Sequence, residues 1–196
     1  EGYKLVKKKS FVGAYYSNNL RLKDEKGEFL LVQYSDTYVD SEKEMESLAE
    51  KFLTFDFVCL DTETTNIDAM SAELVGLSFS VAENEAYYIP IPAEKSEALK
   101  IVNKFKKVYE AENILKIGQN IKYDIIILAN YGIEVRGEIF DTMIAHYILQ
   151  PELRHNMDYL AEIYLGYKTI HIDELIGSRG KKQGNMRDLK PEEVYE

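Results

Sequence analysis

Two acidic residues, separated by one residue, follow a short apolar segment. Asp61 and Glu63 come directly after residues 57–60, an apolar run that we expect to form a buried strand. Side chains two apart on a strand share a face, so the two carboxylates are expected to point the same way. Each carboxylate disfavours ionisation of the other, and a divalent cation removes that cost. Because hard oxygen ligands suit Mg²⁺ or Mn²⁺, the pattern predicts a metal site at the end of this strand.

A solvated pair of surface acids is the alternative interpretation of this spacing. The sequence contains 34 acidic residues, so pairs two apart also arise by chance, and Glu44 and Glu46 form another. The position of Asp61 and Glu63 after an apolar strand, with another strand to follow, favours the functional interpretation.

A third acid, Asp124, lies in the first turns of a predicted helix. It precedes the apolar run 125–128, so it need not face open solvent. The alternative is that an acid near a helix start simply complements the helix dipole. Just upstream, Gln119 and Asn120 are candidates to bind a substrate sugar or phosphate. A plain N-cap explains Asn120 equally well.

The composition describes an acidic globular protein. The chain has 196 residues, of which 45% are hydrophobic and 30% charged, enough for one domain with a real core. A net charge of −10 argues against a protein that coats duplex nucleic acid by charge. It is compatible with an enzyme whose carboxylates hold metal ions that neutralise phosphates.

Cellular location is indicated by three simple features of the chain. No apolar run approaches the ~20 residues needed to cross a bilayer, and the N-terminus lacks the apolar region of a signal peptide. The single cysteine, Cys59, excludes an intramolecular disulfide and suggests a buried thiol. We therefore expect a cytoplasmic protein with no membrane partner.

The first half of the chain is predicted to be mainly β-structure. Residues 1–40 form a β-rich lead-in, in which 11–16 and 28–34 pair as strands around the turn-prone residues 24–27. A domain spanning residues 41–196 follows. It opens with a helix through about Leu53, which Ser41 caps with Glu44 in a capping-box pattern. Three strands at 57–60, 74–81 and 86–91 then suggest a meander, with Pro90 and Pro92 tolerated at its edge or end.

The second half is predicted to be mainly helical. One helix runs from Glu94 to about Ala111, a short strand covers 114–117, and a helix capped by Asn120 ends at Gly132. Two further helices are expected near 142–149 and 157–165. Residues 177–190 are interpreted as a mobile loop, with Pro191 opening a new helix. The element order predicts an α/β layer arrangement with a mixed sheet flanked by helices.

Five short motifs occur along the chain in the order DTET (61–64), LVGLSF (74–79), GQNxKYD (118–124), ANYG (129–132) and FDTM (140–143). In this order they resemble the proofreading 3′→5′ exonuclease domain of bacterial DNA polymerase I. The resemblance runs from about residue 40 to the end, roughly four-fifths of the chain. It implies a ribonuclease H-like fold of the DEDD exonuclease group, with Asp61, Glu63 and Asp124 as catalytic and metal-binding residues.

The third motif of this family, a Tyr followed four residues later by an Asp, has no counterpart after Asp124. The tyrosines there are followed at that spacing by Val135, Pro151, Ile163, Lys168 and His171. Tyr195 would place its partner past residue 196. The sister class, with a His five residues before the Asp, is not supported either. The resemblance implies a domain truncated before its third motif, with this fragment impaired as a nuclease.

Other residues are weaker candidates. Asp141 is tempting as a fourth metal ligand, but we prefer an N-cap for the helix that follows. Ile67 matches an apolar position that in the family wedges against the terminal base, although a core or surface Ile is as good an explanation. Arg179, Lys181, Lys182 and Arg187 form a basic cluster that either guides a single strand or is a solvated loop. Expected substrate contacts are Thr62, Thr64, Ile67, Gln119, Asn120, Tyr123 and Arg154.

The resemblance implies two-metal hydrolysis of the last phosphodiester of a frayed or single-stranded 3′ end of DNA. Two divalent ions, Mg²⁺ or Mn²⁺, would serve as cofactors. The polymerase domain of the same parent chain would be the partner. Two alternatives stay open: a related RNA-trimming exonuclease, and a catalytically inert structural domain of a polymerase.

Overall fold

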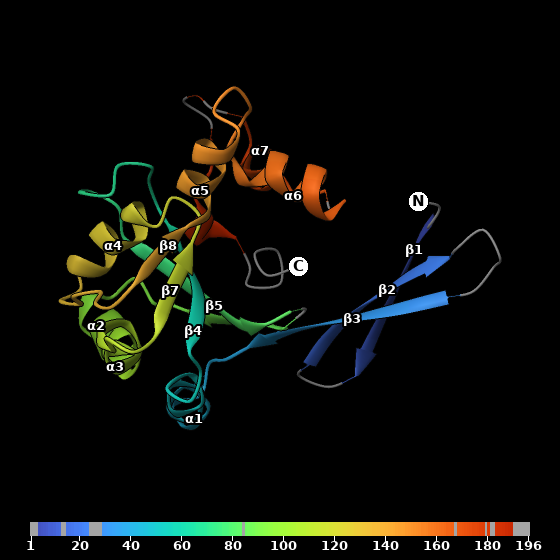
Figure 1. Ribbon diagram of the computed structural model, residues 1–196. Helices are drawn as coiled ribbons and strands as arrows, with labels where there is room; N and C mark the ends of the chain where they lie inside the picture. The colour runs from blue at the N-terminus through green and yellow to red at the C-terminus, as the bar shows by residue number, and fades with distance from the viewer. Residues whose placement is uncertain are drawn as a thin grey trace.

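The chain folds around one eight-stranded mixed sheet with the strand order β1-β2-β3-β6-β5-β4-β7-β8. The computed structural model describes residues 4–12, 15–23, 29–83, 85–166, 168–178, 180 and 183–189, with side chains from Thr37 onward. Figure 1 shows a central body with helices on its outside, from which β2 and β3 extend as a long arm. The strands are β1 Lys4–Val12, β2 Tyr15–Lys23, β3 Phe29–Tyr38, β4 Phe57–Thr64, β5 Leu74–Ala82, β6 Glu85–Pro90, β7 Leu115–Gly118 and β8 Ile139–Asp141.

The N-terminal strands differ from the predicted pair. The strand predicted at 11–16 is wrong, because Phe11 and Val12 end β1 whereas Tyr15 and Tyr16 begin β2. β2 pairs antiparallel with both β1 and β3. Aromatic and β-branched residues lie on both sides of the connection between β1 and β2. Because such residues favour strand, the sequence suggested one strand where the structure has two. The predicted turn at 24–27 lies outside the described residues. At its end, β3 pairs parallel with β6 and so joins the same sheet.

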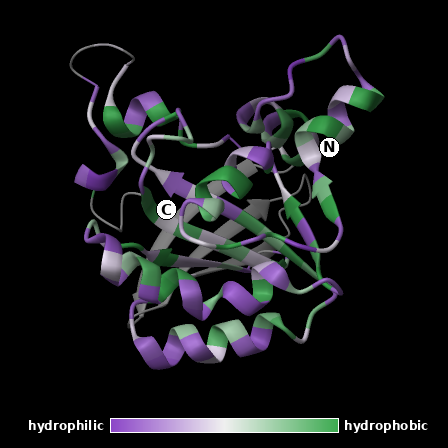
Figure 2. Cartoon of the chain, turned by 90° about the vertical axis from the view of Figure 1, so that its left-hand side faces the viewer, coloured by the Kyte–Doolittle hydropathy of each residue, from purple (hydrophilic) through white to green (hydrophobic). Residues whose placement is uncertain are grey.

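Helix α1, Glu42–Phe52, begins and packs as the sequence predicts. The Ser41 side chain accepts a hydrogen bond from the backbone N–H of Glu44 at 3.3 Å, which confirms the N-cap. Its apolar stripe is buried and includes Phe52, which is fully inaccessible to solvent. In Figure 2 the helices carry alternating green and purple bands, as amphipathic helices should.

The predicted meander is confirmed as β4, β5 and β6, each antiparallel to the next. Pro90 is the last residue of β6, where a missing N–H is tolerated. The single helix predicted from Glu94 to Ala111 is two helices, α2 Lys95–Lys104 and α3 Lys106–Glu110. They meet at Phe105, whose side chain is fully buried and stacks with Phe79.

The remaining helices bring two confirmations and two corrections. The bounds of α5 (Thr142–Leu149) and α6 (Met157–Leu165) match the prediction. The sequence did not predict α7 (Ile172–Ile176). The mobile-loop interpretation is wrong for residues 185–189, which include the 3₁₀ helix η1 (Met186–Asp188) with Met186 buried. The helix predicted from Pro191 lies outside the described residues.

One continuous core lies between the sheet and helices α1 to α4. Fully buried side chains from β4, β5 and these helices include Val58, Leu77, Phe79, Val102 and Leu128. Cys59 is only half-buried, not fully buried as predicted. In the part of the chain that the structure describes, no helix has the length and apolar character to cross a membrane.

Candidate active site

Three parallel strands end at one edge of the sheet, and the candidate residues gather there. β7 lies parallel to both β4 and β8. Chain segments that follow parallel strands meet at the carboxyl edge of the sheet, the usual place for ligand sites in such folds. Helix α4 (Lys122–Ala129) follows β7 after a short turn. The topology therefore places Asp61 and Glu63 of β4 near Asp124 of α4 and Asp141 of β8.

Asp61 and Glu63 share one face of β4. Val58, Leu60 and Thr62 face the buried core, whereas Asp61 and Glu63 are half-buried on the opposite face, as the burial pattern shows. The register of β4 with β5 shifts between Glu63 and Thr64. Such a bulge bends the strand and re-aims its side chains, a frequent device next to active sites. The predicted shared face is confirmed.

Asp124 is buried and forms a hydrogen bond with Thr62 of β4. Only 2% of Asp124 is exposed, and its Oδ1 accepts a hydrogen bond from the Thr62 hydroxyl at 2.6 Å. This contact joins α4 to β4 across 62 residues of sequence. Thr62 therefore fixes the position of an acid, which the sequence alone could not show.

The three carboxyl groups have raised pKa values, so each holds its proton more tightly than a free carboxyl group does. Burial, then the charges of Asp124 and Glu63, raise the pKa of Asp61 to about 8. Burial and the charge of Asp124 raise the pKa of Glu63 as well. Burial raises the pKa of Asp124 to about 6, although the hydrogen bond from Thr62 opposes the shift. The charge of Asp124 contributes to the shifts of both Asp61 and Glu63, so these two acids lie near Asp124.

The turn before α4 differs from its prediction at Asn120. Asn120 does not cap the helix: the N-cap is Ile121, which makes no side-chain capping bond. Asn120 instead adopts a φ of 60°, the left-handed conformation that Asn tolerates better than most residues. Its backbone N–H donates to Asp141 Oδ1 at 3.1 Å, which fixes the turn.

Asp141 is the N-cap that the sequence predicted. Its Oδ1 accepts hydrogen bonds from the backbone N–H groups of Met143 at 2.9 Å and Ile144 at 3.2 Å. Its Oδ2 is buried and has no hydrogen-bond partner among the described residues. The charge of Asp141 adds to the rise in the pKa of Asp124. One carboxylate thus starts α5 and ties the Asn120 turn to it.

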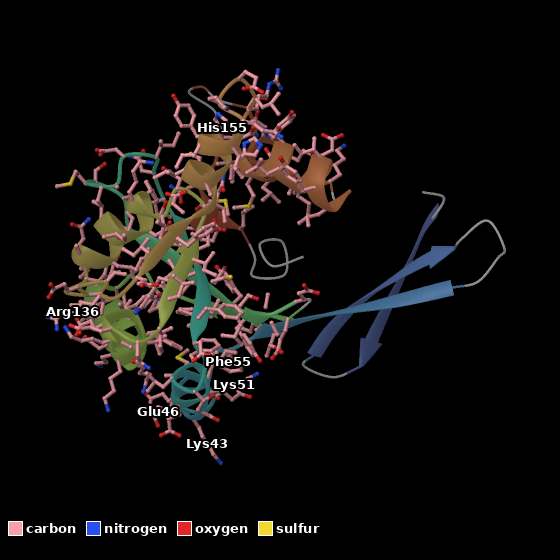
Figure 3. All side chains as sticks on the ribbon, viewed as in Figure 1. Lys43, Glu46, Lys51, Phe55, Arg136 and His155 are labelled. Carbon is pink, nitrogen blue, oxygen red and sulfur yellow. The ribbon has the colours of Figure 1, made fainter. Side chains whose placement is uncertain are left out.

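Gln119 links this turn to the connection between α5 and α6. Its side-chain amide donates to the carbonyl of His155 at 2.6 Å, and its Oε1 accepts from Thr142. The same connection holds Arg154, whose side chain is exposed, and His155, labelled in Figure 3. A substrate role for Gln119 and Arg154 stays a prediction.

Thr64 and Tyr123 join the end of β4 to α4 and to the loop that follows. The Thr64 hydroxyl lies 2.6 Å from the Tyr123 hydroxyl, which also donates to the carbonyl of Asn66. This loop carries Ile67, 72% exposed. The buried-core explanation for Ile67 is therefore wrong, and its contact with a terminal base stays a prediction.

The basic cluster of the sequence is not a cluster of free charges where it is described. Arg187 donates from Nη2 to the carbonyl of Leu74 at 2.7 Å and from Nη1 to that of Ile91 at 3.3 Å. Its hydrogen bonds make Arg187 part of the fold, so the solvated-loop alternative is wrong for this residue, and guidance of a nucleic-acid strand by the cluster stays a prediction. The other three members, Arg179, Lys181 and Lys182, lie outside the described residues.

The donor set fits a hard divalent cation by its chemistry. Every candidate ligand is a carboxylate oxygen, and a positive charge would relieve the repulsion from Asp124 that helps to raise the pKa values of Asp61 and Glu63. Among the residues with described side chains, however, no three His, Cys, Asp or Glu side chains converge closely enough to hold one ion. The present arrangement is a cluster of like charges and not a closed metal cage.

Several solved structures share this fold. The catalytic core of RRP6 from Trypanosoma brucei aligns with a TM-score of 0.62 at 16% identity, covering 82% of this chain and 41% of that one. Escherichia coli RNase D aligns with a TM-score of 0.60 at 17% identity, covering 83% and 40%. Brucella melitensis NrnC bound to pGG aligns with a TM-score of 0.58 at 18% identity, covering 81% and 69%. These similarities confirm the ribonuclease H-like mixed sheet flanked by helices.

Sequence relatives are DNA polymerases. DNA polymerase I of Pseudomonas aeruginosa is 41% identical over 137 residues, which cover 65% of this chain and 15% of the polymerase. That of Borreliella burgdorferi is 38% identical over 152 residues, covering 76% and 16%. The chain thus spans about a sixth of the length of these relatives. A family model for domains of family A DNA polymerases, described as 3′-5′ exonuclease, matches residues 37–190. The chain belongs to this 3′–5′ exonuclease family.

Proposed function

We propose that this domain removes nucleotides from the 3′ end of DNA and proofreads for a DNA polymerase I. One observation carries the proposal: Asp61 and Glu63 lie near Asp124 at the carboxyl edge of the sheet, and the pKa values of Asp61 and Asp124 are raised to about 8 and about 6. Membership of the exonuclease family supports it. We also keep, as a proposal, the division at residue 40 between a lead-in and an exonuclease domain.

Asp61, Glu63 and Asp124 are the residues that would hold two divalent ions, Mg²⁺ or Mn²⁺. When bound, such ions supply Lewis-acid stabilisation of the phosphate and activation of water. A structure of Brucella melitensis NrnC contains bound Mg²⁺. Within this chain, Thr62 orients Asp124 through the 2.6 Å hydrogen bond. The buried setting keeps the carboxylates from competing water, which strengthens their attraction for a cation.

Substrate contacts are proposed for the residues around these acids. Ile67 would meet the terminal base, while Gln119, Asn120 and Arg154 would meet sugar and phosphate groups. Thr64 and Tyr123 would hold the end of β4 against the loop of Ile67. We further propose that residues 1–196 alone cleave poorly, because the sequence after Asp124 contains no Tyr followed four residues later by Asp.

An apolar surface on α5 and α6 supports a partner within the same parent chain. Ile148, Leu149 and Leu165 are 73%, 77% and 78% exposed. Large apolar side chains exposed to this degree are typical of a surface that another chain segment covers. We propose that the polymerase part of the parent protein covers it, and that this protein acts in the cytoplasm.

The direct test is cleavage of 5′-labelled single-stranded DNA by the intact parent protein with Mg²⁺. The proposal predicts a ladder of 3′-shortened products that disappears with chelator and with Asp61→Ala. Absence of the ladder in the wild-type protein, or a ladder that Asp61→Ala leaves unchanged, overturns it.

RNA trimming is the second candidate. The fold similarity to RNase D, named as an exoribonuclease involved in structured RNA processing, favours keeping it. Competition between labelled DNA and RNA ends at equal concentration separates the two. The DNA proposal predicts faster shortening of the DNA, and preferential shortening of RNA replaces it with the second candidate.

A further inference from the structure

The segment 185–189 crosses the base of the loop 65–73. Asn185 donates from Nδ2 to the carbonyl of Thr65 at 3.1 Å, at the start of this loop. Arg187 donates to the carbonyl of Leu74 at 2.7 Å and lies 3.5 Å from the Glu73 carboxylate, at the end of the loop. Met186 is buried between these two residues in the chain. The segment 185–189 therefore forms hydrogen bonds to both ends of the 65–73 loop.

The loop is also fixed by its own bonds and by α4. The backbone N–H of Thr65 donates to the carbonyl of Glu73 at 3.0 Å, and the N–H of Glu73 donates to the Thr65 hydroxyl at 3.0 Å. From α4 and its end, Asn130 Nδ2 donates to the carbonyl of Ala69 at 3.0 Å. The Tyr131 hydroxyl accepts from the N–H of Leu74 at 2.9 Å. The loop is thus held from α4 and from the 185–189 segment.

Two apolar side chains project from this fixed loop into solvent. Ile67 is 72% exposed and Met70 is 76% exposed. The loop begins directly after Glu63 and Thr64, at the end of the strand that carries two of the candidate carboxylates. Apolar side chains held in place without a protein partner suit the face of a nucleobase, and a pre-ordered loop loses little entropy on binding.

The guanidinium of Arg187 is not free to bind a phosphate. Nη1 and Nη2 donate to the carbonyls of Ile91 and Leu74, and Nε is buried. Its position therefore serves the protein itself. A single planar cation joins the end of the 65–73 loop to the residue that follows β6, through two nitrogens of its rigid fork.

We propose that Arg187 is a positioning residue that holds the 65–73 loop so that Ile67 and Met70 meet the base at the 3′ end of the substrate. The proposal rests on the proposed exonuclease function for its substrate. Arg187 acts through the loop and does not touch the nucleic acid.

The test compares Arg187→Ala, Arg187→Lys and Arg136→Ala in the intact parent protein. Arg136 is a matched control, an exposed arginine paired with Glu134 at 2.6 Å and shown at the edge of the molecule in Figure 3. Hydrogen exchange of residues 65–74, measured without DNA, reports on the loop. Affinity for single-stranded DNA in Ca²⁺, with kcat and KM for cleavage in Mg²⁺, reports on the substrate.

Arg187→Ala should accelerate exchange in residues 65–74 about tenfold, because two bonds to carbonyls are lost. It should raise KM and weaken DNA affinity about fivefold, with kcat changed less than about twofold, since the carboxylates are untouched. Arg187→Lys should fall between, because one ammonium cannot replace a fork. Arg136→Ala should match the wild type. Adding Arg187→Ala to Ile67→Ala/Met70→Ala should cause little further loss of affinity.

Three results overturn the proposal: unchanged exchange of the loop in Arg187→Ala, faster exchange with unchanged DNA affinity, or fully additive losses in the combined variant. If Arg187→Ala does not fold, Arg187→Lys and Asn185→Ala decide by the same measurements. A wild-type protein that binds DNA without cutting it defeats the proposed function, whereas the exchange and affinity data still decide the role of Arg187.

Discussion

Charged side chains at the two ends of the central strands differ in whether they have partners of opposite charge. At the carboxyl edge, Asp61, Glu63 and Asp124 all have raised pKa values, and no ion pair of the described residues involves any of them. The Thr62 hydroxyl, a neutral group, donates a hydrogen bond to Asp124. Acidic groups therefore lie near one another at this edge, and no basic side chain of the described residues pairs with them.

At the other end, charged groups are paired or satisfied. Lys51 lies 2.6 Å from Glu85, and this contact raises the pKa of the lysine and lowers that of the acid. Lys116 is fully buried, yet its Nζ donates to the carbonyls of Ala111 and Arg136. Figure 3 shows Glu46 and Lys51 of α1 at the end of the molecule opposite His155.

The difference shows which charges stabilise the fold and which do not. Lys116 shows that this fold accommodates a buried basic side chain when that side chain has hydrogen-bond partners. None of the described basic side chains, however, forms an ion pair with Asp61. Buried like charges without a partner cost stability, so their presence at one edge points to a ligand that supplies the positive charge. Each prediction below tests one side of this comparison.

Removing a carboxylate from the site should have the largest effect. Asp61→Asn should lower exonuclease kcat/KM at least about 100-fold, because even partners outside the metal shell are worth 10–100-fold. Glu46→Gln, at an acid paired with Lys104, is the matched control and should cut as the wild type does. Equal activity of both variants would erase the distinction between the two ends.

Removing the hydroxyl that holds Asp124 should have the next largest effect. Thr62→Val keeps the shape of the side chain but loses the 2.6 Å hydrogen bond. We expect kcat/KM to fall about 10–100-fold and metal affinity to weaken, because Asp124 is no longer oriented. Thermal unfolding should confirm that the variant is folded. Unchanged kinetics would show that Asp124 needs no such support.

The metal-free protein should lose stability as pH rises. The pKa values of Asp61 and Asp124, about 8 and about 6, lie above those of unfolded carboxyls. The folded state therefore binds these protons more tightly, and the free energy of unfolding falls from about pH 4 to about pH 8. At pH 9 without metal, Asp61→Asn should be more stable than the wild type by roughly 1–3 kcal/mol, with little difference at pH 4.

Denaturant unfolding across this pH range measures the effect. Mg²⁺ or Mn²⁺ should flatten the wild-type curve by balancing the charge. A wild-type curve that rises between pH 5 and pH 8 relative to Asp61→Asn would show that the carboxylates are already compensated.

Changes at the opposite end should affect stability and leave catalysis alone. Lys116→Met leaves two carbonyls without their donor and should lower the free energy of unfolding by about 1–3 kcal/mol. Lys51→Ala breaks a largely exposed pair and should cost about 1 kcal/mol or less. Chemical denaturation and kcat at saturating DNA measure both. A large loss of kcat in either folded variant would contradict the separation of roles.

Local sequence predicted the parts of the fold and site that local chemistry determines. The helices α5 and α6, the cap at Asp141 and the strand that carries Asp61 and Glu63 each depend on residues close in the chain. The resemblance to a known family supplied the grouping of these acids with Asp124, which spacing alone left open.

What the sequence could not predict depends on contacts between distant residues. Asn120 satisfies every rule for an N-cap, yet Asp141, 21 residues away, holds it in a left-handed turn. The polar sequence around Arg187 suggested a loop. The carbonyls to which Arg187 donates hydrogen bonds, those of Ile91 and Leu74, lie 96 and 113 residues away. The half-buried state of Cys59 likewise follows from which face of β4 is covered, not from its apolar neighbours.

Calorimetric titration of the intact parent protein with Mn²⁺ tests the central claim most directly. The protein, its Asp61→Asn variant and its Glu46→Gln variant should be compared at pH 7.5 without nucleic acid. An unbalanced carboxylate edge predicts Mn²⁺ binding by the wild type and Glu46→Gln, and binding that is abolished or weakened at least about tenfold in Asp61→Asn. No Mn²⁺ binding by the wild type, or equal binding by Asp61→Asn, would contradict the assignment and favour a domain that serves the polymerase only as a structural element.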